Sequence, residues 1–183
     1  MKRLMTQTES HFEISKDILG NLDLHSSFFD VFRNSYGSYF SEWWHKKLKD
    51  PVYVVKDERI LLGFLKLKIE EKSEDYTDII PYMSPRRRLK ISSLKVDSSC
   101  SSRGLGRRFM QIIFSEAIIH NVDEIYGTVV LEGDTVAGLV KYLERWGFFV
   151  FGHKKSHGIE EDVYVNNNNK EWSNMLFLIN TEY

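Results

Sequence analysis

The chain has 183 residues, of which 42% are hydrophobic, a share that supports one packed core rather than a disordered chain. Its formal net charge of −1 excludes a general field that would attract nucleic acid or a membrane surface. We therefore treat residues 1–183 as a single domain. The single cysteine, Cys100, excludes an intrachain disulfide. With no apolar signal core near Met1 and no run long enough to span a bilayer, the sequence predicts a soluble cytoplasmic protein.

The first half of the chain predicts a strand, a helical region and a pair of strands. A short strand is expected around residues 12–14. Aromatic residues recur every three to four positions from Phe28 to Trp44, which predicts a helix with a break near Gly37. Two β-rich runs at 52–56 and 59–70, separated by a tight turn at 57–58, predict a hairpin. A polar loop at 71–85 comes next.

The second half alternates between strands and helices. It predicts a strand at 90–96, a long helix after residue 106, a strand at 124–130 and a helix at 136–146. Two more strands come after this helix, the first at 149–151, and they are joined by a hairpin turn near Gly158. The apolar run at 175–179 predicts an extra edge strand.

The junction between the strand at 90–96 and the next helix carries the strongest functional signal. Residues 101–108 read Ser-Ser-Arg-Gly-Leu-Gly-Arg-Arg. The first N–H groups of a helix lack intrahelical acceptors, and the helix dipole adds about half a positive charge there. Gly104 and Gly106 let a bulky group approach this backbone, and nearby arginines add charge. The segment therefore predicts a diphosphate site, with an ordinary turn and helix start as the alternative.

Other ligand motifs are weaker. A dinucleotide fingerprint would need a third glycine where Phe109 stands, and a P-loop would need a Gly-Lys-Ser/Thr tripeptide that does not occur. His153 and His157 have a spacing that metal-binding histidines can have, but they flank the expected hairpin turn. We therefore expect no metal site.

Together with a second block further along the chain, the junction resembles the acyl-CoA-binding core of the GNAT superfamily of N-acetyltransferases. The family pattern is a hydrophobic-x-Val strand end, a five-residue step, and Gln/Arg-x-x-Gly-x-Gly/Ala at a helix start. Here residues 94–96 form the strand end, Gly104 and Gly106 take the small-residue positions, and Ser101 replaces the Gln or Arg. The second block, a helix ending in Gly-Phe before a strand, is matched by Gly147-Phe148. The resemblance covers residues 50–165.

The resemblance implies an α/β (α+β) fold with a mixed, mostly antiparallel central sheet that splays between its fourth and fifth strands and is flanked by helices. It also implies acetyl-CoA as co-substrate, with no metal. The residues expected to bind coenzyme A are Leu94, Lys95, Val96, Ser102, Arg103, Gly104, Leu105, Gly106 and Arg107. Part of the wider basic cluster (Arg86 to Arg88, Lys90 and Arg108) would lie beside the phosphates, or else form a solvated face.

Chemistry in such a protein is direct attack of an amine on the thioester, helped by holding the two reactants together. The family's tyrosine acid falls on Leu143 in this chain, so the adjacent Tyr142 is the candidate acid, with packing against the sheet as its alternative. Glu132, just beyond the strand at 124–130, is the candidate base, and an exposed loop carboxylate is the alternative.

The resemblance implies an amine acceptor, either a small molecule or a protein, and it is compatible with a homodimer. Tyr39, Trp43 or Trp44 would contact and select the acceptor if they face the surface. Core packing is the alternative interpretation of the recurring aromatic residues from Phe28 to Trp44. A non-catalytic acyl-CoA-binding module is the alternative function. An acyltransferase acting on nucleic acid is a third and weaker interpretation.

Overall fold

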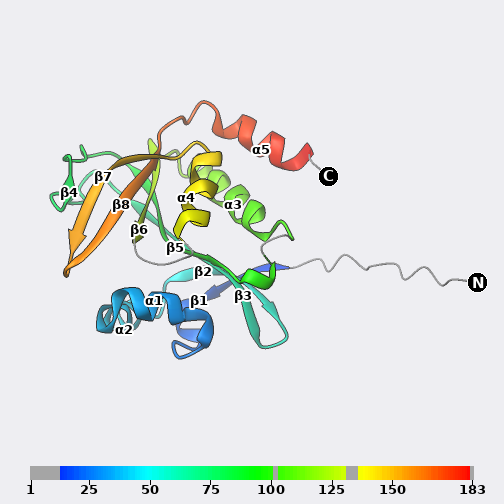
Figure 1. Cartoon of the computed structure of the whole chain (residues 1–183). Coiled ribbons are helices and arrows are strands. Elements are labelled where there is room, and N and C mark those ends of the chain that lie inside the picture. The colour runs from blue at the N-terminus through cyan, green and yellow to red at the C-terminus, as the bar shows by residue number, and fades with distance from the viewer. Residues whose placement is uncertain (1–12, 101–102, 131–135, 182–183) are drawn as a thin grey trace, which may run out of the picture.

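The computed structural model describes residues 13–100, 103–130 and 136–181. Within them a mixed sheet of eight strands runs through the molecule (Figure 1). Every neighbouring pair of these strands is antiparallel except β5 and β6, which are parallel. In spatial order the strands are β1 (Ile14–Ile18), β2 (Pro51–Asp57), β3 (Ile60–Glu70), β5 (Arg88–Val96), β6 (Glu124–Val130), β8 (Ile159–Asn166), β7 (Phe149–Ser156) and β4 (Ile79–Ile80).

The sheet opens between β5 and β6. The two strands pair only from Arg88 to Ile91 on β5 and from Glu124 to Gly127 on β6. Beyond this point β5 continues to Val96 beside β3, whereas β6 continues to Val130 beside β8. The register places an extra residue, Ser92, opposite the bond between Lys66 and Leu67 of β3, and such a bulge bends a strand. We call the resulting opening the V, with a β5 arm and a β6 arm.

Helices cover both faces of the sheet (Figure 1). One face carries α3 (Leu105–Ile119) and α4 (Val136–Arg145), with α5 (Trp172–Thr181) beside α3. The other face carries α1 (Asp30–Tyr36) and α2 (Ser38–His45). Three short 3₁₀ helices complete the described elements: η1 (Leu19–Asn21), η2 (Ser27–Phe29) and η3 (Ser98–Cys100).

Alternation along the strands divides the core between these two layers. Leu65 and Leu89 join the cluster beneath α3 and α4, whereas Phe64 and Val54 join the aromatic cluster beneath α1 and α2. Successive side chains of a strand point to opposite faces, so one sheet can support both layers. No helix in the described part of the chain is long and apolar enough to cross a membrane.

The fold class predicted from the sequence was confirmed, with corrections at four places. The first strand lies at residues 14–18 and not around 12–14, and the loop expected at 71–85 contains the short strand β4, which pairs with β7. The hairpin turn after β2 lies at residues 58–59, one residue later than expected. The expected edge strand at 175–179 was wrong, because this segment belongs to α5. Trp172, Met175 and Leu176 pack against the main core, and their spacing of three and four residues is helical. Residues 175–179 alone form a continuous apolar run, and the helical period becomes visible only when Trp172 is included.

Candidate functional site

The N-terminus of α3 is fixed next to the end of the β5 arm. Leu105, the first residue of the helix, is fully buried. A Cβ atom at Gly63 of β3 would lie 3.0 Å from the side chains of Leu105 and Phe109, so the glycine lets the helix approach the sheet closely. Gly63 is also the register partner of Val96 on β5. The start of α3 therefore lies over the end of the β5 arm.

The backbone at this helix start is open. Gly104 precedes α3 with a φ of +71°, a conformation that favours glycine, and a Cβ there would meet nothing within 4 Å. The N–H of Arg108 donates to the carbonyl of Gly104 in the first bond of the helix. The first N–H groups of a helix have no intrahelical acceptor, so those of Leu105 and Gly106 can bind an anion. The backbone N–H of Arg103 instead donates to the carbonyl of Cys100 at 3.0 Å.

Tyr142 of α4 points at this same helix start. A Cβ at Gly106 would lie 3.1 Å from the Tyr142 hydroxyl oxygen. Within the described residues that hydroxyl is buried without a hydrogen-bond partner, and burial raises the pKa of Tyr142. Leu143, which takes the position of the family's tyrosine, is only 5% exposed and belongs to the main core. Tyr142 is therefore close to the predicted diphosphate loop.

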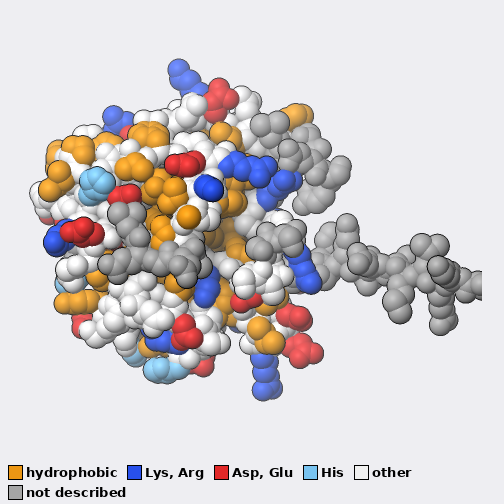
Figure 2. Space-filling view, in the orientation of Figure 1, with side chains coloured by type: hydrophobic (Ala, Val, Ile, Leu, Met, Phe, Trp, Pro, Cys, Tyr) orange, Lys and Arg blue, Asp and Glu red, His pale blue; other side chains and the backbone are white. Residues whose placement is uncertain are grey.

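Most of the basic cluster has other partners. Arg86 and Arg88 both bind the Glu124 carboxylate at 2.8 Å, and Arg87 lies 3.4 Å from Glu71. The Lys95 side chain donates to the carbonyl of Phe28. In the view of Figure 2, Lys and Arg side chains gather over α3 and α4 beside a strip of hydrophobic side chains.

A buried carboxylate on the opposite face was missed by the sequence reasoning. Glu161 of β8 is 6% exposed, and its Oε1 accepts hydrogen bonds from Tyr36 at 2.6 Å and from Thr128 at 2.8 Å. Among the described residues, its Oε2 accepts none. Thr128 is the first residue of β6 beyond the paired segment. The carboxylate therefore lies against the β6 arm, and its place in an alternating strand beside Val163 was the available sequence signal.

A second polar cluster lies where the V begins. Glu70 accepts hydrogen bonds from Tyr126 at 2.5 Å and from Tyr76 at 3.1 Å. Lys90, one residue before the last paired residue of β5, has its Nζ 3.9 Å from Glu70. Burial lowers the pKa of Lys90, because the charged ammonium loses solvent. This cluster and Glu161 put titratable groups at the base and along one arm of the V.

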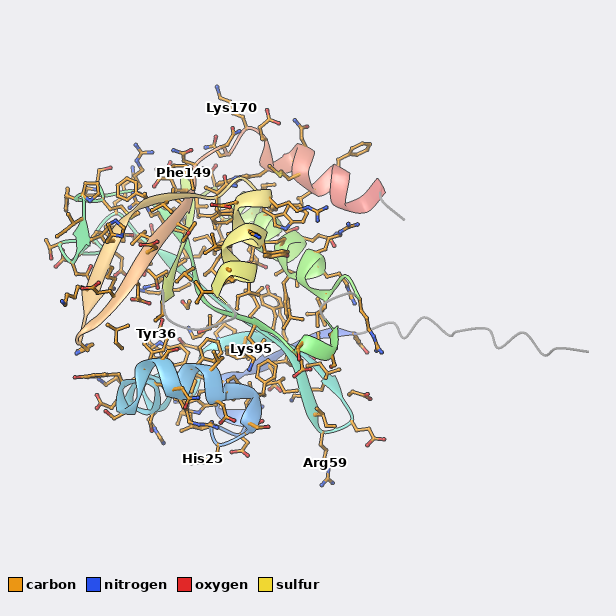
Figure 3. All side chains as sticks on the ribbon, in the orientation of Figure 1. His25, Tyr36, Arg59, Lys95, Phe149 and Lys170 are labelled. Atoms are coloured by element: carbon orange, nitrogen blue, oxygen red, sulfur yellow. The ribbon has the colours of Figure 1, made fainter. Side chains whose placement is uncertain are left out.

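The layer formed by α1 and α2 contacts both arms of the V. Lys95 on the β5 arm reaches the carbonyl of Phe28, which precedes α1, and Tyr36 near the end of α1 reaches Glu161. Figure 3 labels Tyr36 and Lys95, which lie between this helical layer and the sheet. The β7–β8 hairpin is also joined to the layer, because the rings of Tyr39 and His157 stack at 3.9 Å. These contacts connect the layer of α1 and α2 to both arms of the V and to the β7–β8 hairpin.

The three aromatic residues expected to contact the acceptor differ in their exposure to solvent. Trp44 is 2% exposed and packs edge-on against Phe29, so it cannot face an acceptor. Trp43 is half-buried and stacks on Phe40. Tyr39 is 40% exposed. Ser101, Ser102 and Glu132 lie outside the described residues, and the roles expected of them stay predictions.

Among the described residues, no group of three or more His, Cys, Asp or Glu side chains is placed to hold a metal ion. No family model and no curated protein matches the chain.

Solved structures do match it. A chain of the NatC complex bound to Gag peptide and CoA is 16% identical, covers 85% of this chain and 98% of its own length, and has a TM-score of 0.51. Arabidopsis thaliana NAA60 in complex with acetyl-CoA is 16% identical, with coverages of 85% and 99% and a TM-score of 0.57. A GNAT family acetyltransferase from Elizabethkingia anophelis with acetyl-CoA bound is 10% identical, with coverages of 86% and 99% and a TM-score of 0.56. The chain has the fold of GNAT-family acetyltransferases.

Proposed function

We propose that the protein is an N-acyltransferase that moves an acetyl group from acetyl-CoA directly to an amine. The observation that supports this best is the V between β5 and β6 with the open N-terminus of α3 beside its β5 arm. The V offers backbone groups to an extended ligand chain, and the N-terminus of α3 offers N–H donors to a phosphate.

The residues at this end fit coenzyme A. The side of Gly104 that a Cβ would occupy is open, and the Tyr142 hydroxyl close by has no partner among the described residues. On the β5 arm, Leu94 and Val96 pair with β3 on one edge only. Their arm therefore has a free edge on which the pantetheine amides and the thioester can be aligned. An N–H of this edge would stabilise the oxyanion that develops on the carbonyl.

The acceptor enters from the face of α1. Its ammonium group must lose a proton before the nitrogen can attack, and Glu161 is the base that the described residues favour, since its Oε2 accepts no hydrogen bond from them. The C–N bond then forms and the C–S bond breaks, so that the electron pair leaves on the coenzyme A sulfur. Glu132 remains the other predicted base. NatC is bound to a Gag peptide, which makes a peptide N-terminus the first acceptor class to test.

The test begins with calorimetry of the full chain with acetyl-CoA and coenzyme A. Thiol release from acetyl-CoA is then measured with small primary amines and with peptides that have free N-termini. We expect micromolar binding and thiol release with at least one acceptor. An absence of binding would reject the proposal, and binding without release for every acceptor would favour a non-catalytic acyl-CoA-binding module.

Two variants assign the base. Glu161→Gln should lower kcat/KM by about a hundredfold and remove the acidic limb of the pH–rate profile, because the amide cannot take a proton. Glu160→Gln is the matched control, since Glu160 is exposed and pairs with Lys155 at 3.2 Å. If Glu161→Gln keeps full activity, the role of base passes to Glu132.

A further inference from the structure

The Tyr142 hydroxyl is a buried polar group to which the proposed mechanism assigns no role. It is buried, and in the part of the chain that the structure describes it neither donates nor accepts a hydrogen bond. Such a group costs stability unless a ligand supplies a partner. It therefore points to a ligand atom within reach.

The position of the hydroxyl identifies the end of the ligand that it would meet. It lies 3.1 Å from the point where residue 106 would carry a Cβ, in the first turn of α3. A Cβ at this position would be in unusually tight contact with the tyrosine hydroxyl, so Gly106 keeps the space between the hydroxyl and the helix start. The N–H donors of that helix start are the expected diphosphate ligands.

The charges around the hydroxyl would favour a bound anion. Burial has the largest effect on Tyr142 and raises its pKa, while the nearby indole N–H of Trp146 and the positive charges of Arg107 and Arg145 act in the opposite direction. The indole N–H approaches the hydroxyl without forming a hydrogen bond of full geometry, and it is itself buried without a partner among the described residues. One arginine belongs to α3 and the other to α4, so cations from both helices act on the same point. A phosphate oxygen placed there would gain one hydroxyl donor and two nearby positive charges.

The same surroundings make Tyr142 a poor acid for the leaving group. A thiol has an ordinary pKa of about 8.5, whereas a phenol has one of about 10 even before burial raises it. Proton transfer from this hydroxyl to a thiolate would therefore be uphill.

We propose that Tyr142 donates a hydrogen bond to a diphosphate oxygen of coenzyme A at the N-terminus of α3 and does not protonate the departing thiolate. The inference rests on the proposed coenzyme A site. It changes the role of Tyr142 from acid to phosphate ligand. The one-residue offset between Tyr142 and the family's tyrosine position at Leu143 is the sequence counterpart of this change.

The experiment compares the wild-type chain with Tyr142→Phe by calorimetry, using coenzyme A and adenosine 3′-phosphate 5′-diphosphate, which keeps the diphosphate and lacks the thiol. The variant should bind both ligands about tenfold more weakly, because each loses the same hydrogen bond to a charged oxygen. Without ligand, the variant should melt at the same or a higher temperature, because it removes a buried hydroxyl that has no partner. A tyrosine with only a structural role would not combine weaker ligand binding with an unchanged or higher melting temperature on substitution.

The outcomes are distinguishable. Unchanged or tighter binding of the diphosphate probe to Tyr142→Phe would overturn the inference while leaving the acyltransferase proposal in place. A loss of thiol-release rate with unchanged affinity would also overturn it, because that result assigns the acid role. If the wild-type chain binds neither ligand, the proposed function itself fails.

Discussion

The hydroxyl of Tyr36, at the end of α1, donates a 2.6 Å hydrogen bond to Oε1 of Glu161 on β8, across 125 residues of sequence. Burial and the neighbouring carboxylate raise the pKa of Tyr36, so the hydroxyl stays a donor at neutral pH. The bond fixes α1 over the β6 arm, while Lys95 fixes the residues before α1 to the β5 arm. Tyr36 thus sets both the position of the helix and the orientation of the carboxylate that we propose as the base.

Removing this hydroxyl should affect the acceptor and leave coenzyme A unaffected. Tyr36→Phe should lower the free energy of unfolding by about 1–3 kcal/mol, because the bond ends on a charged, buried oxygen. The KM for the acceptor should rise, whereas the Kd of coenzyme A, measured by calorimetry, should not change. Tyr39→Phe is the control, since it keeps the ring that stacks on His157. An equal loss of coenzyme A affinity in Tyr36→Phe would contradict the division between the two faces.

The two neighbouring tryptophans of α2 should behave differently. Trp44 is 2% exposed and lies among Phe29, Phe40 and other aromatic residues, so Trp44→Ala should cost about 3–5 kcal/mol in urea unfolding. Trp43 is half-buried, with Lys66 Nζ 5.7 Å from its ring centroid, and Trp43→Ala should cost clearly less. Equal losses would show that both rings belong to the core.

The order of elements followed from local signals. The break in α1–α2 at Gly37 and the bounds of β6 at 124–130 were predicted from periodicity and β-rich runs, because these patterns need only neighbouring residues. The splay was implied by the resemblance, but its location depends on the bulge at Ser92, and a bulge leaves no reliable sign in the residue types themselves.

The candidate site was predictable on one face only. The proposed coenzyme A side consists of consecutive residues around Gly104 and Gly106, so a sequence pattern can point to it. Glu161 is functional in our proposal because Tyr36 and Thr128 meet it in space, and these residues come from distant elements. The partners of Arg86 and Arg88 were likewise invisible, since Glu124 lies on the next strand of the sheet.

Asn166 should be important for the attachment of α5. It is 1% exposed, its amide donates to the carbonyl of Trp146 at 2.9 Å, and its Oδ1 accepts from the indole of Trp172 at 2.8 Å. Asn166→Ala should cost about 2–3 kcal/mol in urea unfolding, because it leaves a buried donor without a partner. Asn168→Ala, in the exposed loop after β8, should cost almost nothing. Similar losses in the two variants would argue against this buried link.

Tyr76 should make the protein sensitive to alkali. It donates to Glu70, and burial raises the pKa of Tyr76 from 10.0 to about 12. The folded state keeps this proton at a pH where the unfolded chain has lost it, so the contribution is complete below about pH 10 and is lost as the pH rises to about 12. The difference in unfolding free energy between the wild type and Tyr76→Phe should therefore be constant up to about pH 10 and shrink between about pH 10 and pH 12, by the order of 1 kcal/mol. A difference that does not change with pH would contradict this.

The helix start at Gly104 allows a test in which only charge differs. Asn and Asp both tolerate the left-handed conformation at a φ of +71°, and a Cβ there meets nothing within 4 Å, so Gly104→Asn and Gly104→Asp should fold alike. The aspartate places a carboxylate where the diphosphate would bind, and two like charges about 4 Å apart repel by a few kcal/mol near a protein surface. Gly104→Asp should therefore bind coenzyme A about tenfold to a hundredfold more weakly than Gly104→Asn in calorimetry. This gap should narrow as salt screens the repulsion. Equal affinities in the two variants, or a gap that salt does not change, would mean that the phosphates bind away from this helix.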